Sequence, residues 1–205
     1  MEEKARTKKE KRRRLSGLFF GSFNPIHIGH LIIANHMLEF GGLDEVWFIV
    51  SPQNPLKKQK GLLNDHHRLA MVNIAIEDNA RFKASNIEFG LPKPSYTITT
   101  LTVLEEKYPD RDFVLIIGGD NLQTFDKWKN YEILLERYRL LVYPRPGSDG
   151  GKFRQHPSVT WVDAPLMQIS STFIRDSIRM CKSVKYLLPE KVFDYLTEMH
   201  FYTKS

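Results

Sequence analysis

The sequence predicts an α/β protein with a doubly wound, mainly parallel sheet. From Leu15 onward, short apolar runs alternate with segments that have helical spacing, which is the pattern of parallel βαβ units with right-handed crossovers. The 205 residues, 41% of them hydrophobic, are enough for one buried core. We therefore expect residues 15–205 to form a single domain without an internal repeat or linker.

The first half of the chain predicts three strands and two helices. The strands are predicted at residues 15–20, a short apolar run, at residues 45–50 (EVWFIV) and at residues 82–87. Apolar residues at helical spacing predict a helix over residues 29–40, which ends at a pair of glycines. Asp65 is a candidate N-cap for a second helix that runs to about residue 78. The Pro- and Lys-rich residues 51–64 predict a loop between strand and helix.

The second half continues the alternation. Strands are predicted at residues 112–117, 139–143 and 159–162. Helices are predicted at residues 97–107, 171–180 and 189–199, with shorter helical pieces up to residue 136. The run DFVLII is the most strand-like and leads into Gly118 and Asp120. Residues 144–151 (PRPGSDGG) predict a loop insertion.

The basic residues are concentrated at the N-terminus. Residues 1–14 contain eight basic and three acidic residues and so account for +5 of the net charge of +6. A short charge block of this kind is usually solvated and disordered. We therefore predict a disordered basic tail over residues 1–14 and a nearly neutral body. Nucleic acid is not expected as a partner, although the tail leaves RNA or an acidic partner open.

Three further features indicate a cytoplasmic protein that is not in a membrane. No apolar run approaches the ~20 residues that cross a bilayer. The first residues are charged, unlike a secretory signal peptide. The single cysteine, Cys181, cannot form an internal disulfide, which suits a reducing compartment. The sequence leaves a homo-oligomer open.

The turn after the first predicted strand, GSFNPIHIGH at residues 21–30, is the first candidate site. Ligands of doubly wound sheets bind at the carboxyl ends of the strands, and free N–H groups at a helix start favour phosphate. Gly21 and Gly29 allow close approach of the backbone. His27 and His30 can donate to phosphate oxygens and stabilise charge at an attacked phosphorus atom. No carboxylate or cysteine cluster accompanies them, which argues against zinc.

A second candidate site lies at the start of the predicted helix 171–180. The hydroxyls of Ser170, Ser171 and Thr172, with Arg175 one turn later, can clamp phosphates. The alternative is a plain N-cap, which the pair of histidines makes less attractive. Asp120 can accept from a ribose hydroxyl or cap the following helix, and both roles are compatible.

The other candidates have competing structural interpretations. Trp128 can stack on a pyridine ring or belong to the core. Backbone N–H groups at the start of the predicted helix 97–107 can hold a carboxylate. Four basic side chains can neutralise phosphates or lie in solvated loops: Lys57, Lys58, Arg68 and Arg145.

Several segments together resemble one family. GSFNPIHIGH contains the H-x-G-H signature of the nucleotidyltransferase superfamily, and its whole length resembles the corresponding turn of nicotinate-mononucleotide adenylyltransferases. The family's other motifs are matched by PSYTI, IGGDNL, ISSTFIR, the lysine loop at residues 55–58 and the His-Arg pair at residues 67–68. The similarity runs from about residue 15 to about residue 196. Asn24 replaces the commoner aspartate.

The resemblance implies a Rossmann-like nucleotidyltransferase fold and a transferase reaction of NAD biosynthesis. ATP and nicotinate mononucleotide would give nicotinate adenine dinucleotide and pyrophosphate, with Mg²⁺ bound to the ATP phosphates and no protein metal site. The implied catalytic residues are His27, His30 and Arg175. The implied ATP- and phosphate-binding residues are Gly21, Ser22, Phe23, Gly29, Gly118, Asp120, Ser170, Ser171 and Thr172. The implied mononucleotide-binding residues are Asn24, Lys57, Lys58, Arg68, Ser95, Tyr96, Thr97, Trp128 and Arg145.

The expected mechanism is in-line attack of a mononucleotide phosphate oxygen on the α-phosphorus of ATP. Positioning and charge stabilisation suffice for such a transfer. A P-loop kinase is disfavoured because no Walker motif is present. The rivals are pantetheine-phosphate adenylyltransferase, a class I aminoacyl-tRNA synthetase, which would need a longer chain, and a catalytically silent RNA-binding module. The sequence does not decide between nicotinate and nicotinamide mononucleotide.

Overall fold

The structure, a computed structural model, describes residues 12–52 and 61–203. This part of the chain contains a six-stranded, wholly parallel sheet with the order β3-β2-β1-β4-β5-β6. The strands are β1 (Arg14–Gly21), β2 (Glu45–Val50), β3 (Phe82–Ser85), β4 (Arg111–Gly118), β5 (Arg139–Tyr143) and β6 (Val159–Trp161). The order reverses between β1 and β4, so the switch point lies there. The predicted doubly wound sheet is confirmed.

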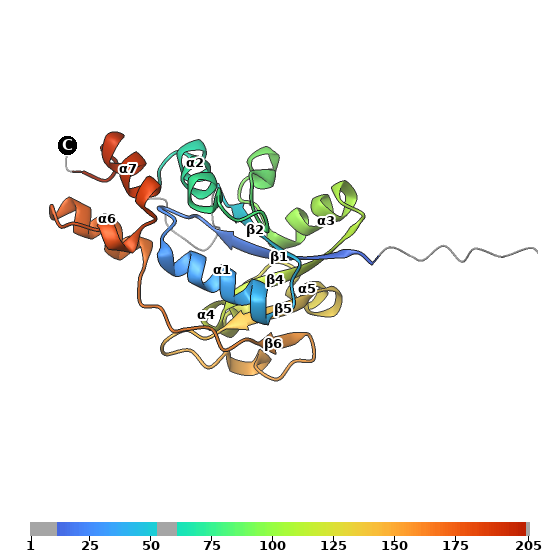
Figure 1. Cartoon of the computed structure of the whole chain (residues 1–205). Helices are drawn as coiled ribbons and strands as arrows, with labels where there is room; N and C mark the ends of the chain where they lie inside the picture. The colour runs from blue at the N-terminus through green and yellow to red at the C-terminus, as the bar shows by residue number, and fades with distance from the viewer. Residues whose placement is uncertain (1–11, 53–60, 204–205) are drawn as a thin grey trace, which may run out of the picture.

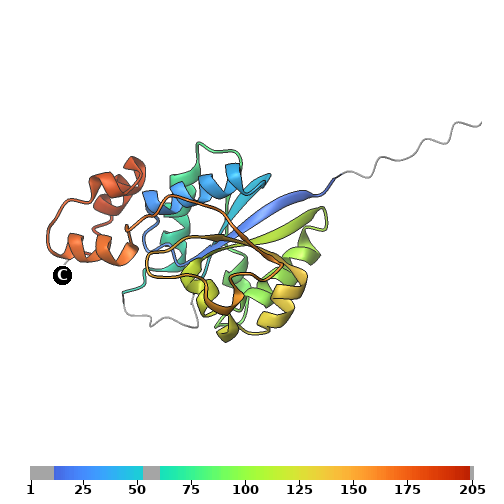
Figure 2. The ribbon, with the colours of Figure 1, turned by 90° about the horizontal axis from the view of Figure 1, so that it is seen from below.

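Helices cover both faces of the sheet (Figure 1). One face carries α1 (Ile28–Phe40), α2 (Asp65–Ile76), α6 (Ser171–Arg179) and α7 (Glu190–Glu198). The other carries α3 (Thr97–Lys107), α4 (Gly119–Gln123) and α5 (Tyr131–Arg137). Figure 2 shows that α6 and α7 lie together at one end of the molecule. This end contains the carboxyl ends of the strands, because α6 contacts the turn that follows β1.

The core has two halves because parallel strands are buried on both faces. β2 is buried at all six positions. In β1, Leu18 belongs to the half beneath α3, α4 and α5, whereas its neighbour Phe19 belongs to the half beneath α1 and α2. In β4, Leu115 and Ile116 divide in the same way. This alternation locks the register of the sheet, because a shift by one residue would exchange the two faces.

Some element boundaries differ from the sequence predictions. The N-cap of α2 is Asn64 rather than Asp65, because the Asn64 side chain accepts the N–H of His66 at 2.9 Å. β3 ends at Ser85, whose hydroxyl accepts the N–H of Ile87 at 3.3 Å as a short 3₁₀ segment, η1 (Ile87–Gly90), begins. Another such segment, η2 (Phe125–Lys127), lies among the predicted short helical pieces, whereas η3 (Gly151–Phe153) and η4 (Lys185–Leu187) were not predicted.

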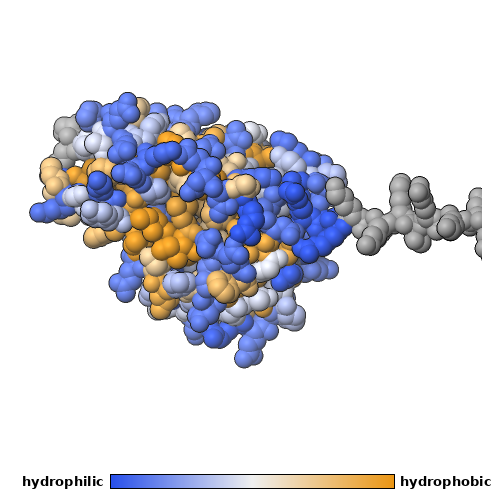
Figure 3. All heavy atoms as spheres, viewed as in Figure 1, coloured by the Kyte–Doolittle hydropathy of each residue, from blue (hydrophilic) through white to orange (hydrophobic). Residues whose placement is uncertain are grey.

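The surface is mainly polar, with one region where hydrophobic side chains gather over α1 and the segment that leads into α6 (Figure 3). Phe40 at the end of α1 and Leu166 in that segment are both exposed. Within residues 12–52 and 61–203, no helix is both long and apolar enough to cross a bilayer.

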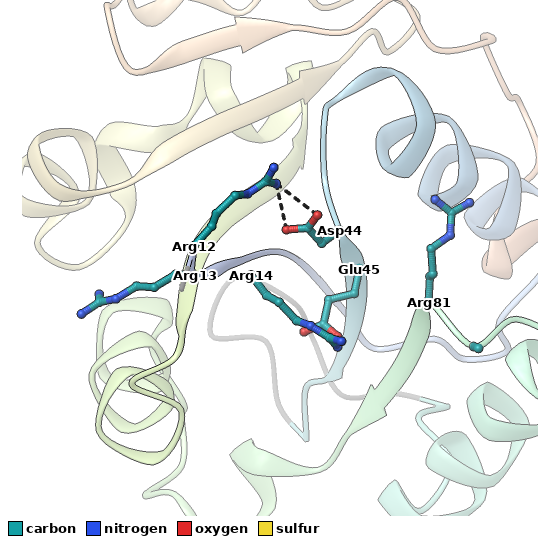
Figure 4. A pocket seen from close by; sticks show the side chains of 7 residues that line it. Arg12, Arg13, Arg14, Asp44, Glu45 and Arg81 are labelled. Carbon is teal, nitrogen blue, oxygen red and sulfur yellow. Dashed lines mark hydrogen bonds and ion pairs between the residues drawn. The ribbon is translucent and has the colours of Figure 1, made fainter. Parts of the chain in front are cut away.

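The end of the predicted tail takes part in the fold. β1 begins at Arg14, and Arg12 donates to both oxygens of Asp44 at 3.1 Å (Figure 4). Arg13 contacts Asp112 at 3.4 Å. These arginines line a cavity of about 540 Å³ at the amino ends of the strands, opposite the switch point. Residues 1–11 lie outside the described part of the chain, so their predicted disorder stays a prediction.

Glu45, at the start of β2, is a buried carboxylate beside this cavity. Its oxygens accept from Ser16 at 2.7 Å, Trp47 at 2.8 Å and Arg111 at 2.9 Å, and Lys83 lies at 2.8 Å. Burial alone would raise the pKa of Glu45, but these four donors together lower it from 4.5 to about 2. The ionised carboxylate therefore joins β1, β2, β3 and β4 at the amino ends of the strands.

We expect Glu45→Gln to lower stability at neutral pH and to matter less in acid. A carboxylate with a depressed pKa stabilises the fold above its unfolded pKa, near 4.5, and this contribution is lost as pH falls through the folded pKa, near 2. Urea unfolding of both proteins from pH 7 to pH 2.5 measures the effect. The gap in unfolding free energy should be constant above about pH 5 and shrink below it. A gap independent of pH would contradict this role of Glu45.

Candidate active site

A cavity of about 640 Å³ opens at the switch point, at the carboxyl ends of β1 and β4. It collects most of the side chains that the sequence singled out, although they come from segments far apart in the chain. The predicted residues that line it are Gly21, Ser22, Phe23, Asn24, His27, Gly29, His30, Ser95, Tyr96, Thr97, Asp120, Trp128, Arg145, Ser170, Ser171, Thr172 and Arg175.

The two histidines form one unit at the start of α1. Their rings are stacked, with centroids 3.7 Å apart and an interplanar angle of 26°. The backbone N–H of His27 donates to Nδ1 of His30 at 3.2 Å. Nδ1 of His30 therefore acts as an acceptor, and a neutral His30 carries its proton on Nε2. This tautomer makes the Nε2–H group the donor that His30 can offer to a phosphate.

His27 is held neutral in the free protein. Burial, and secondarily the positive charge of Arg145, lower the pKa of His27 from 6.5 to about 4. Its Nδ1 is buried and has no hydrogen-bond partner among the residues that the structure describes. A buried ring nitrogen without a partner is costly unless a ligand or water completes it. His27 is therefore uncharged in the free protein at neutral pH, and its Nδ1 can still accept a hydrogen bond from a ligand or water.

We predict that His27 titrates near pH 4 in the free protein and at a higher pH with ATP bound. The triphosphate favours the imidazolium form, so the pKa rises on binding. Heteronuclear NMR of the histidine rings measures both values, and the spectrum of His27→Gln assigns the resonance. Titration of His27 near 6.5 without nucleotide would show that burial and Arg145 do not depress its pKa.

The glycine between the histidines serves the imidazole as well as a ligand. A Cβ at Gly29 would lie 3.1 Å from Nδ1 of His27 and 3.7 Å from Ile169. Gly29 was expected to make room for a nucleotide. It also makes room for the His27 ring, which any side chain at this position would displace. A Cβ at Gly21 would likewise lie 2.8 Å from the ring of Phe23.

The start of α6 is hydrogen-bonded to the turn after β1, although the two segments are about 150 residues apart in sequence. Ser171 donates to the carbonyl oxygen of Pro25 at 2.9 Å, and Nη1 of Arg175 donates to that of Asn24 at 2.7 Å. Ser170 is the N-cap of α6, so the plain capping interpretation also holds for this residue. Nε of Arg175 is buried without a partner within the described residues. Hydroxyls, helix N–H groups and a guanidinium thus face the same cavity as the histidines.

The charged pair at the β4 side of the cavity comes from a helix start and a loop. Asp120 lies in the first turn of α4, and Arg145 follows β5. Nε of Arg145 is 3.6 Å from the Asp120 carboxylate, and its guanidinium lies 5.9 Å from the ring centroid of Tyr143. Gly118 does not line the cavity, but a Cβ there would strike the Asp120 carboxylate. Its role is therefore to make room for Asp120.

The start of α3 forms another wall of the cavity. Tyr96 is the N-cap, and Thr97 is the first helical residue. Ser95 and Thr100 donate to the two oxygens of the buried Glu88 at 2.9 and 2.7 Å. Because the Ser95 hydroxyl is occupied in this way, its contribution to a ligand would come from its backbone. Trp128 is half-buried against Phe125, with ring centroids 4.9 Å apart, so it is both a wall of the cavity and part of the core.

Three predicted residues have other roles in this geometry. Arg68 does not line the cavity, and its guanidinium donates to backbone carbonyl groups, which corrects the expectation of phosphate contact. Asn24 lines the cavity, but its side-chain amide hydrogen-bonds to Gly61, Leu63 and Tyr202. An ionised aspartate, the commoner residue at this position in the family, could not donate to the Gly61 carbonyl as the amide does. Phe23 is 2% exposed, so its ring belongs to the core.

Lys57 and Lys58 lie outside the described residues, so their assignment stays a prediction. Other cavity-lining residues were missed by the sequence analysis. Those with polar or charged side chains are Ser51, Glu88, Asn121, Lys127, Lys129 and Tyr143. The two lysines flank Trp128, and that position beside a predicted site residue was the signal that could have found them.

The fold and site together define a nucleotidyltransferase. The family described as "Cytidylyltransferase-like" matches residues 18–177. A "Probable nicotinate-nucleotide adenylyltransferase" of Christiangramia forsetii is 54% identical over 188 residues, which cover 91% of this chain and 97% of that protein. The protein of the same name from Flavobacterium johnsoniae is 53% identical over 92% of this chain and 98% of its own length. The chain belongs to the nicotinate-nucleotide adenylyltransferase family.

Among solved structures, the nicotinic acid mononucleotide adenylyltransferase of Plasmodium falciparum complexed with NaAD has a TM-score of 0.78. The match covers 92% of this chain and 97% of that chain, at 19% sequence identity. At this identity the likeness concerns the fold, and it agrees with the parallel sheet and its strand order.

Proposed function

We propose that the protein joins ATP and nicotinate mononucleotide to give nicotinate adenine dinucleotide and pyrophosphate, a step of NAD biosynthesis. The observation that carries this proposal is the convergence of the His27–His30 pair and the α6 start on one cavity at the switch point. The names of the relatives support the pyridine substrate. In this proposal, residues 15–205 form a single domain, and the expected compartment is the cytoplasm.

The ATP end of the site is the side formed by the first turn and α6. His27 and His30 hold the phosphate that is attacked and the one next to it, while Thr172 and Arg175 hold the outer phosphates. Asp120 accepts from the ribose. Hydrogen-bond donors that are already in position stabilise the negative charge that develops during in-line attack. This lowers the activation barrier of the transfer without a covalent intermediate. The adenylyl group passes to the mononucleotide phosphate, and pyrophosphate leaves.

The mononucleotide end is the side formed by α3 and Trp128. The aromatic faces of Tyr96 and Trp128 suit a flat pyridine ring, and the first N–H groups of α3 favour a negatively charged substituent. Arg145, on the β5 side, is available for the mononucleotide phosphate. These roles require no rearrangement of the core, because all of these residues already line one cavity.

Mg²⁺ is the proposed cofactor, bound with the triphosphate. No three His, Cys, Asp or Glu side chains gather into a metal site in the described residues. Asp120 is the more accessible of the two carboxylates that line the cavity, because Glu88 is buried and hydrogen-bonded to Ser95 and Thr100. One carboxylate fits Mg²⁺, which commonly binds through substrate phosphates and retained waters. When bound, the ion would neutralise charge on the phosphates.

The test is pyrophosphate release from ATP with Mg²⁺ and one acceptor at a time: nicotinate mononucleotide, nicotinamide mononucleotide or 4′-phosphopantetheine. The proposal expects strong preference for the first. Preference for nicotinamide mononucleotide would keep the class of enzyme and change its substrate. Release only with 4′-phosphopantetheine, or with none of the three, would refute the proposed function.

A further inference from the structure

Lys129 lies at the pyridine end of the cavity, immediately after Trp128. Its Nζ is 4.5 Å from the centroid of the Tyr96 ring, and both side chains line the cavity. Tyr96 is the N-cap of α3, so the ammonium group lies over the side chain of the residue at the start of that helix. A full positive charge and the partial positive charge of a helix start therefore occur at the same wall.

The described residues offer Lys129 no carboxylate within 4.0 Å, whereas Arg145, another cation that lines the cavity, is paired with Asp120. Two carboxylates line the cavity. Glu88 is 2% exposed, and the hydroxyls of Ser95 and Thr100 each occupy one of its oxygens. Asp120 faces Arg145 instead. An anionic substituent on a ligand would therefore find a cation here that no protein carboxylate has neutralised.

The two candidate pyridine mononucleotides differ at one position. Nicotinate carries a carboxylate, which is ionised at neutral pH, and nicotinamide carries a neutral carboxamide of similar size. Stacking walls such as Tyr96 and Trp128 bind both rings alike. Backbone N–H groups can donate to an oxygen of either substituent, so they discriminate weakly. A cation at this wall distinguishes the two substituents, because it attracts the ionised carboxylate more strongly than the neutral carboxamide.

We propose that Lys129 is a specificity-determining residue that makes the site prefer the acidic pyridine mononucleotide over the amide. This inference rests on the proposed function and adds to it a side-chain origin for the choice of substrate. Because Lys129 is exposed to solvent, its charge is partly screened, and we expect a preference of about five- to tenfold from it rather than an absolute one.

Lys129→Met tests the proposal by removing the charge while keeping a long side chain. The measured quantity is the ratio of kcat/KM for nicotinate mononucleotide to that for nicotinamide mononucleotide. Where amide turnover is slow, its inhibition constant replaces kcat/KM. The ratio should fall about five- to tenfold through a higher KM for the acid, while the amide changes by less than about twofold. Lys129→Arg, which keeps the charge, should retain most of the preference.

Lys107→Met is the matched control. Lys107 ends α3 and lies 5.5 Å from the ring of Tyr108, so it is also a lysine over a tyrosine, but outside the cavity. This variant should keep the wild-type ratio. Equal changes for acid and amide in Lys129→Met, no change for either, or the same fall in the control would overturn the inference. These outcomes leave wild-type activity with the acid intact, whereas failure of the proposed function appears as a wild-type protein inactive with both pyridine nucleotides.

Discussion

His30→Ala is expected to lower turnover by about 10²–10³-fold, the size of effect that follows loss of one key charge-stabilising donor. Nδ1 of His30 accepts from the backbone of His27, so a neutral His30 carries its proton on Nε2 and would donate to a phosphate oxygen from there. A donor fixed by the backbone needs no reorganisation as charge develops on the phosphates. The loss should therefore appear in kcat for pyrophosphate release, and less in KM for ATP.

His36→Ala is the control for this prediction. His36 is on the same helix, and its ring stacks on Phe40 at 4.3 Å on the protein surface rather than in the cavity. Its removal should leave turnover within about twofold. Thermal unfolding of both variants checks the fold, because His30 also packs against the ring of Phe23. Normal turnover in folded His30→Ala, or an equal loss in His36→Ala, would refute the role of His30.

Most of the fold could be predicted because its signals are local. A strand such as β2 is a glutamate followed by five apolar residues between turns, and its predicted limits match the structure. α3 and β5 are likewise found where predicted. The βαβ alternation then leads to a parallel sheet with right-handed crossovers. Boundaries were wrong where a side chain decided them, as at Asn64, because which of two neighbouring residues caps a helix depends on backbone angles.

The candidate site could be predicted where residues adjacent in sequence make it up. The His27–His30 pair and the start of α6 are such segments, and the switch-point rule brings both to the same edge of the sheet. Contacts made by long side chains could not be predicted. Whether Lys129 lies over Tyr96 or in solvent depends on how the segment after α4 folds back on α3. The hydrophobic periodicity of the sequence carries no information on this contact.

Arg68 shows the same limit more strongly, since it was grouped with two loop lysines as a candidate phosphate ligand. It is 0% exposed, and its guanidinium donates to the carbonyl oxygens of Ser51 at 2.9 Å, Leu63 at 3.1 Å and Ser22. It also pairs with Asp65. These acceptors belong to the turns after β1 and β2 and to the start of α2. The guanidinium therefore joins the three segments beneath the cavity wall formed by Ser22 and Ser51.

Arg68→Met is accordingly expected to destabilise the protein by about 3–5 kcal/mol, because it leaves several buried carbonyl groups without their donor and Asp65 with only the more distant Lys93. Arg68→Lys should recover only part of this loss, since an ammonium cannot reproduce the planar fork of five N–H donors. Urea unfolding at neutral pH measures both.

The control is Arg81→Met, which removes an exposed arginine paired with Glu39 and should cost less than about 1 kcal/mol. If Arg68→Met cost no more than this control, the buried guanidinium would not be what joins these segments. If the loss instead appeared only as a higher KM for ATP in a protein of unchanged stability, Arg68 would contact substrate phosphate after all, and the geometry of the free protein would have to change on binding.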